Sequence, residues 1–318
     1  MKKQLSLKNV FVSIENHIVS WNLKKLAKYM IVLAVIVGLV GSYLWYSRMY
    51  MTNERRFWLA INNSMATQSV TRTLTSGGSG NTVVQEQQLF FAPQKVSRSH
   101  VSFIQKSATV DTAVETEGIS FVDHQFSRYN TFRTNQPRED GTVPNLDAVL
   151  GKWEGNKVPE DQLEDARLNY VSELVTLAVF GNFGPEFRSD VISQLRQNNV
   201  YQLNIDGISE DTIDGKKVLI YPVSVGLKSF TTALQKAFTQ AGYGEFPPLD
   251  PANYTEDSRV NATFAVDPKN NSIAGIQFGS RAEQYSGYGI FINVTKPNVD
   301  FENGQLEEFV QQEIQTAL

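Results

Sequence analysis

Histidine is the side chain best suited to acid–base chemistry near neutral pH, and this chain of 318 residues has three, His17, His100 and His124. Asp123 precedes His124, an order in which an acid can orient a general base, and His100 and His124 are also of the type that ligates metals. Both lie in strand-like sequence, RSHVSF and VDHQF, where ordinary strand or turn histidines also occur. These residues form no constellation that predicts catalysis.

Carboxylates cluster at the start of a helix expected after about residue 160, namely Glu160, Asp161, Glu164 and Asp165. Acidic side chains in a first turn interact favourably with the helix dipole, which explains the cluster, and a cation site is the alternative. The run SGGSG at 76–80 has the composition of a flexible loop, and no apolar helix follows it as a phosphate-binding loop requires.

Cysteine is absent from the sequence. This excludes disulfides, thiolate nucleophiles, Cys-ligated zinc and iron–sulfur clusters. The motifs of zinc peptidases, serine hydrolases and nucleotide-binding loops are absent as well. We therefore expect a protein that is not an enzyme, with no catalytic residue, cofactor or metal.

Charge is divided unevenly along the chain. Residues 1–56 carry nine of the 29 basic and two of the 33 acidic side chains, which leaves a net charge of -11 on the rest. An acidic domain of this kind repels phosphate backbones, so we expect no nucleic-acid partner.

Residues 29–47, YMIVLAVIVGLVGSYLWYS, carry no charge. A helix of this length spans a hydrocarbon core of roughly 30 Å. Tyr29 at one end and Trp45 and Tyr46 at the other are expected at the membrane interfaces, where amphipathic rings settle. The sequence thus predicts a transmembrane helix, with the lipid bilayer as a partner.

Lysines are more numerous before this span than arginines after it, which favours a cytoplasmic N-terminus and an extracytoplasmic domain over 54–318. Bulky residues, SYLWYSRMY, follow the apolar stretch in place of a small-residue cleavage site, so we expect an uncleaved signal anchor in the cell membrane. Residues 1–28 repeat apolar side chains at helical spacing. They form an amphipathic helix on the inner membrane surface, a docking segment for a cytoplasmic partner, or a weakly ordered tail.

The first part of the domain is rich in Thr, Val, Phe and Ser, a composition typical of β-strands. Strands are expected at 69–75, 82–91, 95–105, 112–122 and 125–133. Their short connections favour an antiparallel meander. Residues 134–160 hold three prolines and three glycines and predict a long loop or a domain boundary.

The second part mixes helices and strands. Helical spacing of apolar residues predicts helices at 54–65, 163–180, 185–198, 228–241 and 304–317. Strands are expected at 199–206, 216–225, 259–267, 272–279 and 284–295. Pro222 lies inside one of these strands and suits an edge or a bend of a curved sheet.

The run DGKKVLIYPVSVGLKSFTTALQKAF (214–238), followed by ATFAVDPKNNSIAGIQF (262–278), resembles the lipoprotein-carrier half-barrel family. That family includes LolA-type periplasmic carriers and LppX-type mycobacterial lipid-binding lipoproteins. The resemblance implies an α+β fold in which a curved antiparallel β-sheet, a half-barrel, has helices packed on one face and holds acyl chains between them. This chain departs from the family because it lacks a cleavable signal peptide and a lipidation cysteine, which argues against a carrier that shuttles.

If the resemblance holds, eight apolar residues are candidate positions in a ligand cavity or in the core. They are Leu219, Tyr221, Val223, Phe264, Ile276, Phe278, Ile290 and Ile292. The expected function is a membrane-anchored extracytoplasmic domain that binds a lipid or other apolar ligand. The alternative is a cell-surface or envelope-assembly domain that binds an envelope protein and has no ligand cavity.

Overall fold

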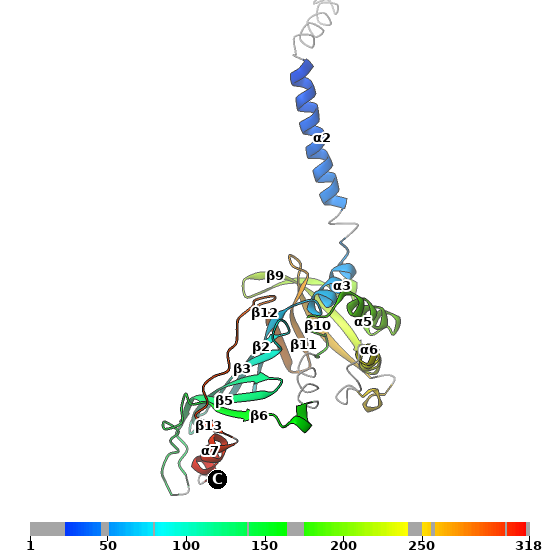
Figure 1. Cartoon of the computed structure of the whole chain (residues 1–318). Coiled ribbons are helices and arrows are strands. Elements are labelled where there is room, and N and C mark those ends of the chain that lie inside the picture. The colour runs from blue at the N-terminus through cyan, green and yellow to red at the C-terminus, as the bar shows by residue number, and fades with distance from the viewer. Residues whose placement is uncertain are drawn as a thin grey trace, which may run out of the picture. The chain divides into compact units, whose positions relative to one another are not determined.

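The computed structural model describes residues 23–45, 51–78, 80–138, 140–163, 175–240, 250–255, 258–302 and 304–315 (Figure 1). The chain forms two compact units, residues 1–55 and 56–318. The expected loop or boundary at 134–160 lies inside the second unit.

The first unit contains helix α2, Leu23–Trp45. Within it, Ala27–Trp45 is long and apolar enough to cross a membrane, and its side chains are exposed. Tyr29 and Trp45 lie at the two ends of this stretch. Length and composition of this kind occur in signal anchors and in signal sequences alike. Tyr46 and residues 1–22, which make up most of the expected amphipathic segment, lie outside the described residues.

The second unit is built on one large sheet that is almost entirely antiparallel. Its strands are β1 (Ser69–Gly78), β2 (Asn81–Phe90), β3 (Val96–Lys106), β4 (Asp111–Phe121), β5 (His124–Thr134), β6 (Glu154–Lys157), β7 (Tyr201–Leu203), β8 (Ser209–Ile213), β9 (Lys216–Gly226), β10 (Arg259–Asp267), β11 (Ser272–Phe278), β12 (Arg281–Ser286) and β13 (Phe301–Glu302). They follow the order β13-β6-β5-β4-β3-β2-β1-β12-β11-β10-β9-β7, and β8 also pairs with β9. Among the described strands, the single parallel pair is that of β13 with β6. The expected meander is confirmed as β1 to β5.

The helices of the second unit are α3 (Asn53–Ser64), α5 (Pro185–Gln197), α6 (Leu227–Gln240) and α7 (Gln305–Gln315). Pro185 starts α5, where the N–H that proline lacks would have no helical partner. Figure 1 shows α3, α5 and α6 gathered beside β9, β10 and β11, whereas α7 lies beside β13. The fold is therefore α+β, with most helices over one part of the sheet.

The main core lies between these three helices and the sheet. Phe57 of α3 is fully buried, and its ring centroid lies 5.4 Å from those of Tyr201 and Phe264 and 5.7 Å from that of Tyr221. Aromatic pairs at such separations, mostly edge to face, add to the free energy of burial. This cluster joins α3 to β7, β9 and β10.

Pro222 sits within β9 where a gap separates β7 from β8. Asn204 donates its backbone N–H to the carbonyl oxygen of Pro222, so the main-chain groups of Pro222 face that gap. The missing N–H of proline therefore removes no ladder hydrogen bond, although β9 is not an edge strand.

The prediction of a helix at 163–180 is wrong for residues 175–180. Residues 164–174 lie outside the described part, and 175–180 form an irregular turn. Val179 bridges Val175 and accepts a hydrogen bond from Ser64 Oγ at 2.8 Å, while Phe180 is buried in the core. Apolar spacing there reflects core packing of a turn, which a periodicity argument cannot separate from a helix.

Two expected strands are shorter than predicted. The strand at 199–206 is reduced to β7, because the 3-10 turn Ile205–Gly207 follows, held by Asn204 Oδ1, which accepts from Gly207 N. The strand at 284–295 ends at Ser286, because Gly287 and Gly289 adopt φ values of +63° and +69° that break extended pairing. Residues 287–300 then run without strand pairing to β13, and we call this segment the strap (Figure 1).

Candidate functional site

The strand register defines two faces of the sheet, because residues directly opposite each other in paired strands point to the same side. One row crosses nearly the whole sheet on the side that carries the core: Tyr221, Phe264, Ile276, Glu283, Leu74, Gln85, Val101, Thr116 and Tyr129. We call this side the helix-bearing face. The opposite side, which includes Thr73, Glu86 and His100, is the open face.

Six of the eight candidate apolar residues lie in or against the main core. Tyr221, Val223, Phe264 and Ile276 are buried in it, and Leu219 and Phe278 are partly buried against it. Burial raises the pKa of Tyr221 to about 12, so its hydroxyl stays neutral. These side chains pack against helices, and in this part of the sheet they form core.

Ile290 and Ile292 are placed differently. They belong to the strap and are 57% and 45% exposed, because the strand that was to carry them ends before residue 287. Val294, further along the strap, is buried against Phe90, Val96, Ile119 and Phe126 on the open face. The strap is thus fixed at Val294 and leaves the two isoleucines in contact with solvent.

The helix-bearing face continues beyond the main core over β1 to β4 with five half-buried apolar side chains. These are Leu74, Val83, Val101, Phe103 and Val114, which we call the apolar patch. In the part of the chain that the structure describes, they belong to none of the three buried clusters. Tyr129 and Phe132 on β5 border the patch and pack against the cluster around α7.

Charged and hydroxyl groups lie between the main core and the apolar patch. Glu283 is 2% exposed, accepts from Arg281 Nε at 2.6 Å and accepts from the hydroxyl of Tyr285. Tyr285 stacks on Phe180 with ring centroids 4.5 Å apart. Burial and the neighbouring Glu283 carboxylate both raise the pKa of Tyr285 well above its usual value. Tyr285 therefore acts as a neutral hydrogen-bond donor.

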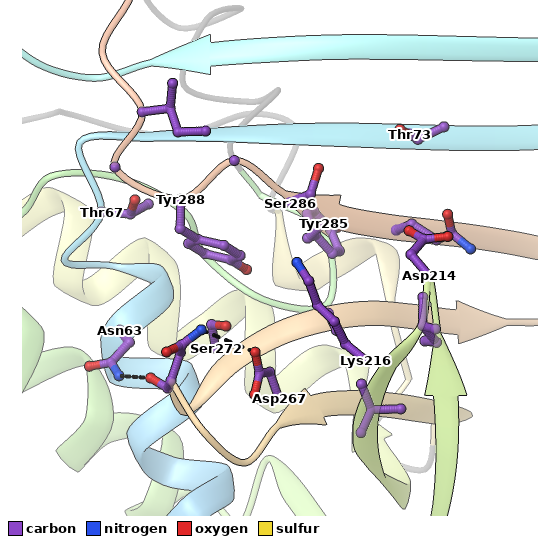
Figure 2. A pocket seen from close by; sticks show the side chains of 18 of the residues that line it. Asn63, Thr67, Thr73, Asp214, Lys216, Asp267, Ser272, Tyr285, Ser286 and Tyr288 are labelled. Atoms are coloured by element: carbon purple, nitrogen blue, oxygen red, sulfur yellow. Dashed lines mark hydrogen bonds between the residues drawn. The ribbon is translucent and has the colours of Figure 1, made fainter.

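The open face carries a hollow with a volume of about 800 Å³ (Figure 2). Its walls come from the end of α3, the β8–β9 hairpin, the β10–β11 turn and the start of the strap. The side chains of Lys216 and Tyr288 point into it in Figure 2. Asn63 Nδ2 donates to the carbonyl of Asn271 at 2.9 Å, and Tyr288 donates to that of Ile273 at 2.6 Å. These bonds fix two of the walls.

An ion network lies further along the open face, on β3, β4 and β5. Glu117, whose side chain is 6% exposed, accepts from Arg98 Nε at 2.8 Å and from Arg128 Nε at 3.0 Å. Burial raises the pKa of Glu117, but the hydrogen bonds and charges of the two arginines outweigh it and hold that pKa below its usual value. The guanidinium of Arg128 lies 4.5 Å from the ring centroid of Trp153.

The structure does not bring His100 and His124 together as a pair. His100 stands on β3 opposite Glu86 and Glu117, whereas His124 Nδ1 lies 3.0 Å from Asp123 and 2.9 Å from Lys296 Nζ in an exposed group. In the described part of the chain no group of three His, Asp or Glu side chains is arranged to hold a metal. Glu160 and Asp161 lie in the 3-10 turn Glu160–Gln162, and Glu164 and Asp165 are outside the described residues.

Comparison with known proteins finds a likeness in structure but none in sequence. No family model matches the chain, and no curated protein matches it. Among solved structures, the chain is similar to LprF from Mycobacterium bovis, with 12% identity and a TM-score of 0.38 over 77% of this chain and 98% of that one.

Proposed function

We propose that this chain is a membrane-anchored, non-catalytic protein whose extracytoplasmic domain binds a lipid or another apolar ligand on the apolar patch. The observation that supports the proposal is the position of the patch. Five apolar side chains on the helix-bearing face are only half-buried and stand outside every described core cluster. Contiguous apolar surface of this kind on a soluble domain usually serves an interaction.

Covering the patch contributes favourably to binding. Fully burying one Val, Leu or Phe side chain stabilises by about 1.5–3 kcal/mol, and each of these side chains is already more than half covered. Together the five therefore offer roughly 1–5 kcal/mol to an apolar ligand. Acyl chains match this surface because they need no hydrogen-bond partner.

The anchor limits where such binding takes place. Ten residues lie between Trp45, the last residue of α2, and Arg56, the first residue of the second unit. At no more than about 3.6 Å per residue, this segment keeps the start of the domain within roughly 40 Å of the membrane. A ligand would therefore be taken up or handed over at the membrane surface.

The test is native mass spectrometry of the full chain extracted in a mild detergent, with the co-purified lipid also quantified after organic extraction. Wild type is expected to carry a lipid-sized adduct. Phe103→Asp places an unpaired charge in the patch and is expected to reduce bound lipid by roughly tenfold or more. Ile104→Asp is the matched control, because Ile104 is the next residue on β3, points to the open face and is 46% exposed.

Two results would contradict the proposal. One is a wild-type chain that carries no lipid and takes none up from added vesicles. The other is an equal loss of lipid in both variants, which would mean that the charge acts through folding and not through the patch.

The strap supports a second candidate function, that of an envelope-assembly or cell-surface domain that binds another protein. Ile290, Phe291 and Ile292 are consecutive, each at least 45% exposed, and apolar. A photo-crosslinking amino acid at Phe291 should then give one discrete adduct in cells, and the same group at Ile104 should give none. A heterogeneous smear of adducts that is the same for the crosslinker at Phe291 and at Ile104 would contradict this function.

A further inference from the structure

The open face has more than one hollow, and the hollows adjoin. The hollow of about 800 Å³ is followed by one of about 110 Å³ beneath the strap and by one of about 330 Å³ over β2, β3 and β4. Ile290 lines both the first and the second, and Gln88 lines both the second and the third. The three hollows therefore lie in a row on the open face, and we call this row the open-face groove.

This groove crosses the strands instead of following them. It passes from the β8–β9 hairpin over β10, β11, β12, β1 and β2 to β3 and β4, with residues of the strap along part of one side. Neighbouring strands lie about 4.8 Å apart, so a path over the eight strands from β9 to β4 is roughly 35 Å long. A linear ligand of several units fits such a path better than a single small molecule does.

The side chains along the groove have unused hydrogen-bonding capacity. In the first hollow, Thr73, Asp214, Lys216 and Gln284 make no side-chain hydrogen bond or ion pair within the described structure. In the second and third hollows the Oε1 atom of Gln88 is buried and has no partner. Hydroxyl, amide, carboxylate and ammonium groups thus face the groove together.

The charges that line the groove disfavour a ligand that is either uniformly negative or uniformly positive. Asp214 and Lys216 stand close in sequence at one end, and Glu86, Arg98 and Glu117 alternate at the other. A polyanion or a polycation would meet a like charge at each end. A neutral chain rich in hydroxyl groups meets no like charge and finds donors and acceptors at both ends, since a hydroxyl can play either part.

An extended peptide is a poorer match for the groove. Peptides that bind to sheets add to an edge, where unpaired main-chain groups supply the hydrogen bonds. The open-face groove lies on a face, where those groups already pair with neighbouring strands. Ile290, Ile292 and the ring of Tyr288 offer apolar contacts, which suit the C–H faces of sugar rings.

We propose that the open-face groove binds a neutral oligosaccharide or polysaccharide chain, on the side of the sheet opposite the apolar patch. This site is separate from the apolar patch and does not depend on lipid binding. A protein with both sites would hold a glycan on one face and an apolar ligand on the other.

The experiment uses the full chain in nanodiscs and isothermal titration calorimetry. The probes are neutral oligosaccharides of glucose, mannose and N-acetylglucosamine, from two to eight sugars long. At least one series is expected to bind, with affinity that rises with length. Gln284→Ala in the first hollow and His100→Ala in the third should each weaken binding of the longest probe by roughly 3- to 10-fold, the loss of one or two hydrogen bonds.

Ser102→Ala is the matched control, because Ser102 is on the open face of β3 but lines none of the three hollows. This variant should bind as wild type does. The proposal is overturned if no series binds, if long probes bind no more tightly than disaccharides, or if Ser102→Ala weakens binding as much as the other two variants.

Discussion

Replacing Glu117 by glutamine tests whether the ion network on the open face stabilises the domain. The substitution keeps the shape of the side chain but leaves only one oxygen to accept hydrogen bonds, and the new amide N–H₂ meets an arginine donor. Glu117 accepts from Arg98 and Arg128, so one of the two loses its partner.

The magnitude follows from the exposure of the two arginines. Arg98 is 45% exposed, so water replaces its lost partner at little cost. Arg128 is 28% exposed and is held against Trp153, so it is less free to turn to solvent. A hydrogen bond to a charged group contributes about 1.5–3 kcal/mol, and partial exposure places this one near 2 kcal/mol.

Thermal unfolding followed by circular dichroism measures the change on the full chain in detergent. For a unit the size of residues 56–318, about 2 kcal/mol corresponds to a Tm about 4–8 °C lower. Glu115→Gln is the matched control, because Glu115 lies on the same strand and face and accepts from Thr131 Oγ1 but from no arginine. Its Tm should change by less than half as much.

The pH dependence carries the sharper test. Folding lowers the pKa of Glu117 below its ordinary value of 4.5, so the ionised side chain stabilises the fold above that pH. This stability is lost as the pH falls through the lower pKa of the folded state, where the protonated acid resembles glutamine. The difference in Tm between wild type and Glu117→Gln should therefore shrink below about pH 4.5. A difference that stays constant from pH 7 to pH 3 would refute the reasoning.

Three further predictions concern the core, the strap and the anchor. Phe264→Ala removes a fully buried ring and should lower the free energy of unfolding by about 3–5 kcal/mol. Phe291→Ala removes a half-exposed ring and should change that free energy by less than about 0.5 kcal/mol. Chemical denaturation measures both changes. Val294→Asp puts a charge among buried aromatic and aliphatic side chains. The substitution should speed hydrogen exchange in the strap while the helical content of the protein stays unchanged. An unaltered exchange rate would show that Val294 does not hold the strap in place. The intact mass of the membrane-extracted chain should include residues 1–28, and a mature N-terminus near residue 48 would show cleavage instead.

The strands that the sequence predicts best are those in which alternation and turns agree. The expected meander matches β1 to β5 within three residues at every end, because alternate Thr, Val and Ser positions lie between clear turn residues. The strands β6 and β8 were not expected. Their sequences, EGNK and SEDTI, have no alternation of apolar and polar residues. The two strands form because a longer neighbouring strand, β5 for β6 and β9 for β8, offers main-chain hydrogen-bond partners along its side.

The sequence names the apolar residues of the candidate site but cannot assign them to core or surface. Tyr221 and Phe264 are core because Phe57, more than 160 positions earlier, lies against them. Phe103 is left outside the described core although it has the same residue type and a similar strand context. That distinction depends on which helices cover which strands, and this is decided by contacts between distant segments.

The open-face groove had no signal in the sequence. Its residues are polar positions of strands and turns, and Asp214, Gln88 and Gln284 are far apart along the chain. Only the register of β12 beside β1 brings them into one line. A polar alternation in the sequence indicates a solvated face but not that several such faces align.

The pairing of β1 with β12 has a consequence for how the protein is made. The two strands lie side by side near the middle of the sheet, yet about 200 residues of chain are synthesised between them. While translation proceeds, β1 is an open edge of the nascent meander. In the same way, β6 cannot pair with β13 until residue 302 has been synthesised. The sheet can therefore close only after almost the whole polypeptide has left the ribosome. During that time the open edge of β1 is available for pairing with other chains.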